Sequence, residues 1–165
     1  MTATYDSIAT TTLTTGTTQV DFNTINQNFT DLVLVIVGNV ASDSLNPTMR
    51  FNGDSGTNYS STWVAGSGST ASSSRLTSAN VTYLGALGSA ISTITVHFMN
   101  YANTTTNKTA LVRNSSTTGS SGQSVSAWVD LWRSTAAITS ISLISSGGNQ
   151  WQSGTTFTLY GIKAE

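Results

Sequence analysis

Cysteine is absent from this chain of 165 residues, proline and histidine occur once each, and only 8% of the residues are charged. Without cysteine the chain can form neither a disulfide nor a thiolate metal site. With His97 as the single histidine, a histidine-based metal site is nearly excluded as well. Stability must therefore come from a hydrophobic core, which a chain of this length can build by burying roughly 70% of its surface.

Charge is scarce and evenly spread. The formal net charge is −1, and the six basic residues are scattered singly, so no basic patch is available for a phosphate backbone. The longest apolar run, residues 32–37, is far shorter than the roughly 20 residues that cross a bilayer. The N-terminus also lacks a basic region followed by an apolar stretch. We therefore expect no nucleic-acid partner, no signal peptide and no membrane anchor.

Hydroxyl side chains replace the missing charge, since Ser and Thr supply roughly a third of the chain. The hydrophobic fraction is 38%, which is enough to build a core and argues against disorder. Apolar residues alternate with polar ones at a period of two, which is typical of half-buried strands. The pattern predicts eight or more strands, with candidates at residues 5–13, 18–22, 31–37, 48–52, 59–65, 80–84, 93–99, 108–114, 124–131, 138–144 and 156–162.

Two of these segments allow more detailed predictions. Residues 31–37 are continuously aliphatic, which favours a central strand covered on both faces. Residues 124–131 alternate, so Trp128 shares one face with Asp130 and Trp132, while the valines lie on the other. Because both faces are apolar, we expect one of them to be covered by a second layer or by another subunit.

Turn residues separate the predicted strands, and no segment of ten or more residues has a clean helical stripe. The Gly/Ser-rich stretches 66–74 and 114–122 are interpreted as exposed loops. We predict an all-β, antiparallel two-sheet sandwich, specifically a jelly roll, with a barrel as the alternative. Residues 1–165 form a single domain in this prediction, and residues 1–22 form an extended arm or an edge strand.

Candidate catalytic groups are few. His97 lies in a predicted strand opposite its apolar face, and the carboxylates show no pair whose placement is typical of a glycosidase. The oxygen-rich stretch 52–58 is interpreted as a hairpin turn, with a calcium loop as the alternative, because it lacks the spacing of an EF-hand. We therefore expect no enzyme activity, no catalytic residue, no metal and no cofactor.

Aromatic residues are the more informative candidates for binding. The residues proposed for an interface or a glycan contact are Trp63, Trp128, Trp132, Trp151 and Tyr5. An aromatic residue in a strand usually belongs to the core, but Trp151 follows a glycine-rich turn. It could instead form a loop-tip platform for a sugar ring.

Four stretches together resemble a known group of proteins. They are residues 5–10 (YDSIAT), 50–60 (RFNGDSGTNYS), 137–143 (AITSISL) and 156–163 (TFTLYGIK). They resemble the small β-sandwich structural proteins of tailed bacteriophages, including cyanophages, which are found in the head or the tail. The resemblance spans almost the whole chain and carries no catalytic motif. It implies a virion structural protein.

The resemblance and the composition together lead to two functional expectations. The first is a capsid cement or decoration protein that stabilises the phage head by binding capsomers. Its partner would be the major capsid protein or another virion protein, it would be a homotrimer, and it would lie on the particle surface after assembly in the host cytoplasm. The second is a tail-fibre, spike or baseplate protein that binds host-surface glycans through Trp151, Trp63 and the Ser/Gly loops. A depolymerase is a more distant alternative.

Overall fold

The computed structural model describes residues 4–42, 46–118, 122–145 and 149–163. Within these ranges it contains twelve strands and no helix, so the prediction of an all-β chain is confirmed. This part of the chain accordingly offers no helix that could cross a membrane. The strands are β1 (Tyr5–Thr12), β2 (Gln19–Phe22), β3 (Asp31–Gly38), β4 (Thr48–Phe51), β5 (Tyr59–Gly66), β6 (Ala71–Ala79), β7 (Thr82–Tyr83), β8 (Ser92–Met99), β9 (Lys108–Thr118), β10 (Gly122–Trp132), β11 (Ile141–Ile144) and β12 (Thr156–Ile162).

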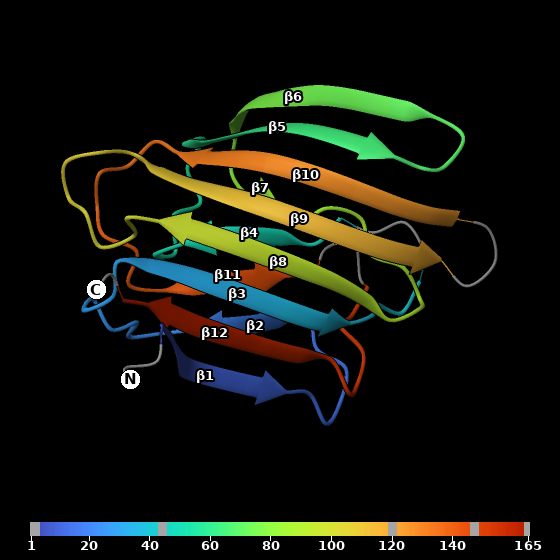
Figure 1. Cartoon of the computed structure of the whole chain (residues 1–165), viewed down its shortest axis with the longest axis horizontal. Helices are drawn as coiled ribbons and strands as arrows, with labels where there is room; N and C mark the ends of the chain where they lie inside the picture. Colours follow the sequence, from blue (N-terminus) through green and yellow to red (C-terminus); the bar gives the residue numbers. More distant parts are fainter. Residues whose placement is uncertain (1–3, 43–45, 119–121, 146–148, 164–165) are drawn as a thin grey trace.

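The strands form two antiparallel sheets that lie one behind the other in Figure 1. The larger sheet has eight strands in the order β1-β12-β3-β8-β9-β10-β5-β6, and the smaller has four in the order β2-β11-β4-β7. The half-sheet β1-β12-β3-β8 together with β2-β11-β4-β7 has the strand order of a jelly roll, in which the first and last strands are neighbours. The predicted two-sheet sandwich is therefore confirmed, down to its jelly-roll strand order.

Two hairpins are added to this jelly roll. β5 and β6 are inserted between β4 and β7, and β9 and β10 between β8 and β11. Both hairpins extend the larger sheet beyond β8, with β6 at its far edge. Figure 1 shows β5 and β6 at the top of the larger sheet, beyond the strands of the smaller one. The larger sheet thus overhangs the second layer.

The core lies between the inner faces of the two sheets. On the larger sheet Leu34, Val96 and Leu159 are completely buried at matching positions of three adjacent strands. On the smaller sheet Met49 and Leu143 are buried opposite one another. The buried residues of both sheets form one hydrophobic cluster, as expected for alternating strands stacked face to face.

β3 departs from its predicted environment. It is an inner strand paired with β12 and β8, but the second layer covers only one of its faces. On the other face Val33 is buried by its neighbours, Val35 is half-buried and Val37 is 39% exposed. The prediction that β3 is covered on both faces is therefore wrong, because its apolar outer residues have no layer above them within the described chain.

Two predicted loops are wholly or partly strands. Residues 71–74 belong to β6, and residues 114–118 continue β9, whereas 119–121 lie outside the described residues. Neither segment has apolar alternation, so the periodicity gave no signal for them. They are strands because their backbones pair with β5 and β10, which provide the hydrogen-bonding partners.

The segment 1–22, expected to be an arm or an edge strand, has the edge-strand geometry where it is described. β1 pairs with β12 at one edge of the larger sheet, and β2 pairs with β11 at one edge of the smaller sheet. Near the bulge after Ser7, Asp6 forms an ion pair with Lys163, with 2.6 Å between carboxylate Oδ2 and Nζ. Both strands therefore belong to the two sheets of the sandwich as edge strands.

Candidate functional site

The two faces of β10 have different surroundings. Trp128, Asp130 and Trp132 point inward and are buried, whereas Val125 and Val129 point outward and are exposed. The second layer thus covers the tryptophan face. The sequence predicts that one of the two faces is covered, and the valine face has no cover within the described chain.

The outward valines belong to a larger apolar patch on the outer face of the sheet. Val125 is 63% exposed, Val129 is 54% exposed, and Val64 on β5 is 55% exposed. Val64 lies opposite Ala127, and Val129 lies opposite Leu111 of β9, so the residues are adjacent across three strands. We call Val64, Leu111, Val125, Ala127 and Val129 the outer patch.

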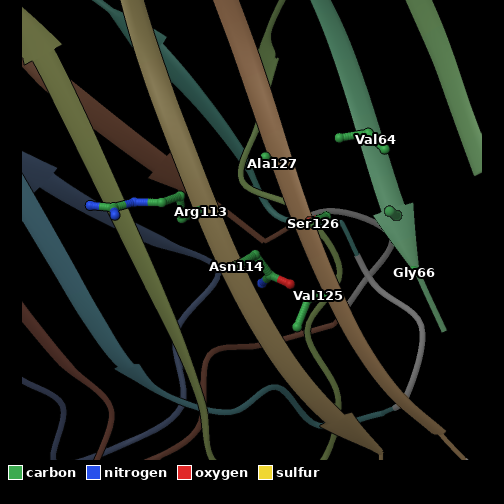
Figure 2. Close-up of a pocket in the computed structure, with 8 residues that line it drawn as sticks. Val64, Gly66, Arg113, Asn114, Val125, Ser126 and Ala127 are labelled. Carbon is green, nitrogen blue, oxygen red and sulfur yellow. The ribbon is translucent and has the colours of Figure 1, made fainter. Parts of the chain in front are cut away.

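A shallow hollow lies within the outer patch (Figure 2). It forms where Gly66, which lacks a side chain, pairs with Val125 of β10. Figure 2 shows Val64 and Gly66 on one side of the hollow and the β10 residues beside them. Because its lining is mainly Val, Ala and Gly, this hollow favours contact with an apolar group.

His97 lies on the same outer face, between Val33 and Leu111 of the neighbouring strands. Its Nε2 is 2.8 Å from the Arg113 guanidinium, which extends from β9 toward β8 in Figure 2. Because a guanidinium only donates, Nε2 accepts this hydrogen bond and the imidazole is neutral. Burial, together with the nearby positive charge of Arg113, lowers the pKa of His97. The hydrogen bond between His97 and Arg113 therefore links β8 to β9.

Asp54 occupies the stretch that the sequence offers as a hairpin turn or a calcium loop. Its carboxylate accepts hydrogen bonds from the Gly56 amide, the Asn58 side chain and Trp132 Nε1, the last at 2.7 Å. The hydrogen bond from Trp132, followed by that from Asn58, lowers the pKa of Asp54. Among the described residues no three His, Cys, Asp or Glu side chains gather into a metal-binding group. The carboxylate here closes a turn and anchors Trp132.

Trp132 is part of a buried aromatic cluster at one end of the sandwich. Its ring stacks on Tyr59 with 6.3 Å between ring centroids and lies 5.5 Å from Phe51. Phe51 in turn contacts Phe98 edge to face at 5.8 Å. Since Trp132 is buried, its role is in the core and not at an interface.

Trp63 and Trp128 form a second aromatic group, located where the larger sheet begins to overhang. Their rings stack with 5.3 Å between centroids, and Tyr83 of β7 stacks on Trp128 at 5.8 Å. Trp128 is buried, whereas Trp63 is only half-buried. A cleft opens beside these rings, lined by Asn46, Trp63, Ala65, Ser72, Ala86, Ser124, Ser126 and Trp128.

The remaining two aromatic candidates lie elsewhere. Trp151 is completely buried, with its ring edge to face on Phe157 at 5.0 Å. It is therefore a core residue, and the alternative of a loop-tip platform is wrong. Tyr5 is 53% exposed at the β1 edge, where it contacts Tyr160. Of the five predicted aromatic residues, only Trp63 and Trp128 meet at one site.

Asp130 is a feature that the sequence does not single out. Asp130 is 1% exposed, and neither oxygen of its carboxyl group lies within hydrogen-bond geometry of a partner among the described residues, although the Ser61 hydroxyl is close by. Burial raises the pKa of Asp130 to about 7, and Ser61 offsets the shift only in part. The alternating pattern indicates that Asp130 shares a face with two tryptophans, and this is the one signal that it is buried.

Comparison with protein-family models gives no match, and no curated protein matches the chain. Among solved structures, a protein of unknown function, SO2946 from Shewanella oneidensis MR-1, aligns over 86% of this chain and 62% of its own, with 10% sequence identity and a TM-score of 0.21. The chain thus spans less than two thirds of that protein's length. The interpretation of function rests on the residues of this chain.

Proposed function

We propose that this chain is a non-catalytic structural protein of a virus particle, which attaches to neighbouring subunits through the outer face of its larger sheet. The cement or decoration role on a phage head fits this mode of attachment best. The outer patch carries the proposal, with Val64, Val125 and Val129 each more than half exposed on adjacent strands.

An exposed apolar patch of this kind favours a protein partner. Contact between water and three exposed valines is unfavourable. Removing this apolar surface from water stabilises a complex by roughly 25 cal/mol for each Å² buried. Further apolar residues lie on the same outer face on β3, namely the half-buried Val35 and the exposed Val37, which the polar outward residues of β8 separate from the outer patch. An apolar surface that crosses several strands is suited to a flat partner surface rather than to a small ligand.

The residues of the outer patch are uncharged. The charged neighbours on this face are Arg113, which lies opposite Ala127 and is hydrogen-bonded to His97, and Arg75 of β6, which lies opposite Thr62. Contacts made by such a surface are insensitive to ionic strength, unlike ion pairs, which salt screens. Among partners of this chemistry we favour a second copy of the chain, in a homotrimer that sits on a capsid protein, since closed symmetric assemblies are the common form.

Two further considerations support the proposal. Jelly rolls are widely used in viral capsids, although a fold by itself does not imply a function. The sequence resemblance to small tailed-phage structural proteins points the same way.

Sedimentation velocity of the purified chain at 0.15 M and 1 M NaCl tests the mode of association. We expect a trimer at both salt concentrations, and we expect Val129→Glu to give a monomer because it places a charge in the outer patch. Thr93→Glu is the matched control, since it puts the same charge on the same face of β8 outside the patch. A wild-type monomer at high protein concentration, or a trimer that survives Val129→Glu, would contradict attachment through this face.

Immunogold labelling tests the location directly. Antibodies raised against the purified chain should decorate intact particles from the virus that encodes it, at regular positions on the head. Label on the tail would instead support the tail-component alternative. Particles without label, from a preparation in which the chain is detected only in the soluble fraction, would exclude a virion role.

A further inference from the structure

We propose that the cleft under the overhanging part of the larger sheet binds a neutral saccharide, with Trp63 as the ring on which a sugar stacks. This inference is independent of the proposed attachment surface, because the cleft lies on the inner face of the sheet and the outer patch lies on the other. We call the site the Trp63 cleft, and its eight lining residues are those given above.

The Trp63 cleft exists because the second layer ends before the larger sheet does. Its floor is the inner face of β10, β5 and β6, where Trp63 pairs with Trp128 on one side and with Ser74 on the other. The opposite wall is formed by Asn46, which precedes β4, and Ala86, which follows β7, at the same end of these two paired strands. β6 is exposed along its length, so the cleft is open at the sheet edge.

The aromatic rings at the cleft are held in place before any ligand arrives. Trp128 lies between Trp63 and Tyr83 in a stack whose ring planes deviate by 28° and 23°. Trp128 Nε1 donates to the Ser126 hydroxyl at 3.0 Å, which fixes that ring further. Because Trp63 is supported by a fixed ring and remains half-exposed, it offers a rigid apolar surface at low entropic cost.

Polar groups surround the rings. The side chains of Ser72 and Asn46 make no hydrogen bond within the described part of the chain, and both are exposed. Ser126 accepts from Trp128 and retains its own hydroxyl hydrogen for a further acceptor. An apolar platform with hydroxyl and amide groups at its margin matches a pyranose ring, which has an apolar face of C–H groups and a rim of hydroxyls.

Charge selects among possible ligands. None of the eight residues lining the Trp63 cleft is ionisable. An acidic sugar or a phosphate would lose solvation there without gaining a cationic partner, which is unfavourable. The cleft therefore favours neutral sugars. Its open edge favours an internal stretch of an oligosaccharide chain rather than a single sugar.

Fluorescence quenching tests the proposal with the unmodified protein. Trp128, Trp132 and Trp151 are buried, so acrylamide reaches mainly Trp63. We expect at least one neutral hexasaccharide, among those of glucose, galactose, mannose and N-acetylglucosamine, to protect this fluorescence at millimolar concentration, and polygalacturonic acid to give no protection. No protection by any neutral sugar would overturn the proposal, as would protection by poly-L-proline alone, which would indicate a peptide groove.

Variants then locate the site by calorimetry. We expect Trp63→Ala to weaken binding at least about tenfold and Trp63→Phe to retain most of it, since Phe keeps an aromatic face. Thr62→Ala is the matched control, because the preceding residue on β5 faces the other way and is not a residue of the outer patch, and it should change affinity less than about twofold. Equal weakening by Trp63→Ala and Thr62→Ala would contradict the site. Val129→Glu should abolish the trimer without reducing sugar binding, which separates failure of one proposal from failure of the other.

Discussion

The two halves of the larger sheet differ in what they bury. In the jelly-roll half, β8 alternates strictly between buried inner residues and outer residues that face solvent, and its partner β3 buries every inner side chain. In the added half, β6 is exposed at all but its last position, and β5 becomes exposed beyond Ser61. The first half is thus core along its whole length. The added half contributes core residues from β9, β10 and the start of β5, while β6 and the rest of β5 add mainly surface.

This difference indicates how stability and binding are divided. One buried cluster joins the jelly roll to β9, β10 and the start of β5, so the part of the added half beyond this cluster is free to present side chains that a compact domain would bury. The outer patch and the Trp63 cleft lie on opposite faces of the added half. Both proposals therefore concern the part of the molecule that contributes least to its core.

The largest expected effect sharpens this contrast directly. Leu34→Ala removes a completely buried side chain from β3 and should lower the free energy of unfolding by about 2–5 kcal/mol. Leu76→Ala on β6, where the side chain is 36% exposed, should lower it by about 1 kcal/mol or less. Urea unfolding followed by tryptophan fluorescence measures both. Similar losses for the two variants would show that β6 belongs to the same cooperative core.

Asp130 tests the boundary between the halves, since it lies on β10 between Trp128 and Trp132. An unfolded aspartate ionises near pH 4, whereas burial raises the pKa of this one to about 7. Between these pH values the unfolded chain has lost the proton and the native chain has kept it. The stability of the wild type should therefore fall as pH rises, by up to about 4 kcal/mol once the native carboxyl is also ionised.

Asp130→Asn should remove this dependence. The variant should be more stable than the wild type at pH 8, and the advantage should shrink steadily toward pH 4, below which neither state of the wild type is charged at this position. Urea unfolding at intervals of one pH unit measures the difference. A difference that stays constant with pH would mean that Asp130 is solvated or paired in the native protein.

Asp54 gives a smaller effect of opposite sign. Its carboxylate accepts three hydrogen bonds, including the one that anchors Trp132, and they lower its pKa in the native state. Its contribution is therefore present above the unfolded pKa and is lost as pH falls through the lower native value. Asp54→Asn should cost about 1–3 kcal/mol at pH 7 and much less at pH 2.5, again by urea unfolding. A loss that grows as pH falls would contradict this account.

The fold was largely predictable because the jelly-roll half obeys local rules. In β8 and β12 apolar and polar residues alternate, which identifies both segments as strands. Every inner residue of the two strands is buried, including Val96 and Leu159. β6 has no such pattern in its serine-rich sequence, and it is a strand because β5 offers it a free edge. Local periodicity thus predicts strands that build the core and misses a strand that exists only through pairing.

The candidate site was less predictable. The sequence places Trp63 and Trp128 in separate strands, and their stacking depends on a register between β5 and β10 that no local signal reports. Trp151 illustrates the same limit, since the sequence left open a core position and a loop-tip platform, and only the structure shows that Trp151 is buried against Phe157. Which of two apolar faces receives the second layer is likewise a property of the whole topology.

The smallest expected effect on stability concerns the outward face of β10. Val129→Thr keeps the β-branched shape and replaces one methyl group with a hydroxyl on a side chain that is 54% exposed. The unfolding free energy of the isolated chain should change by about 0.5 kcal/mol or less, as is usual for surface positions.

Association should weaken measurably, because a hydroxyl buried at an interface without a partner is unfavourable. Sedimentation over a range of protein concentrations, with Thr62→Val beside it on β5 as the reciprocal change, measures this. If Val129→Thr destabilises the isolated chain as much as a core substitution does, the outer patch is covered by the chain itself and the contrast between the two faces of β10 fails.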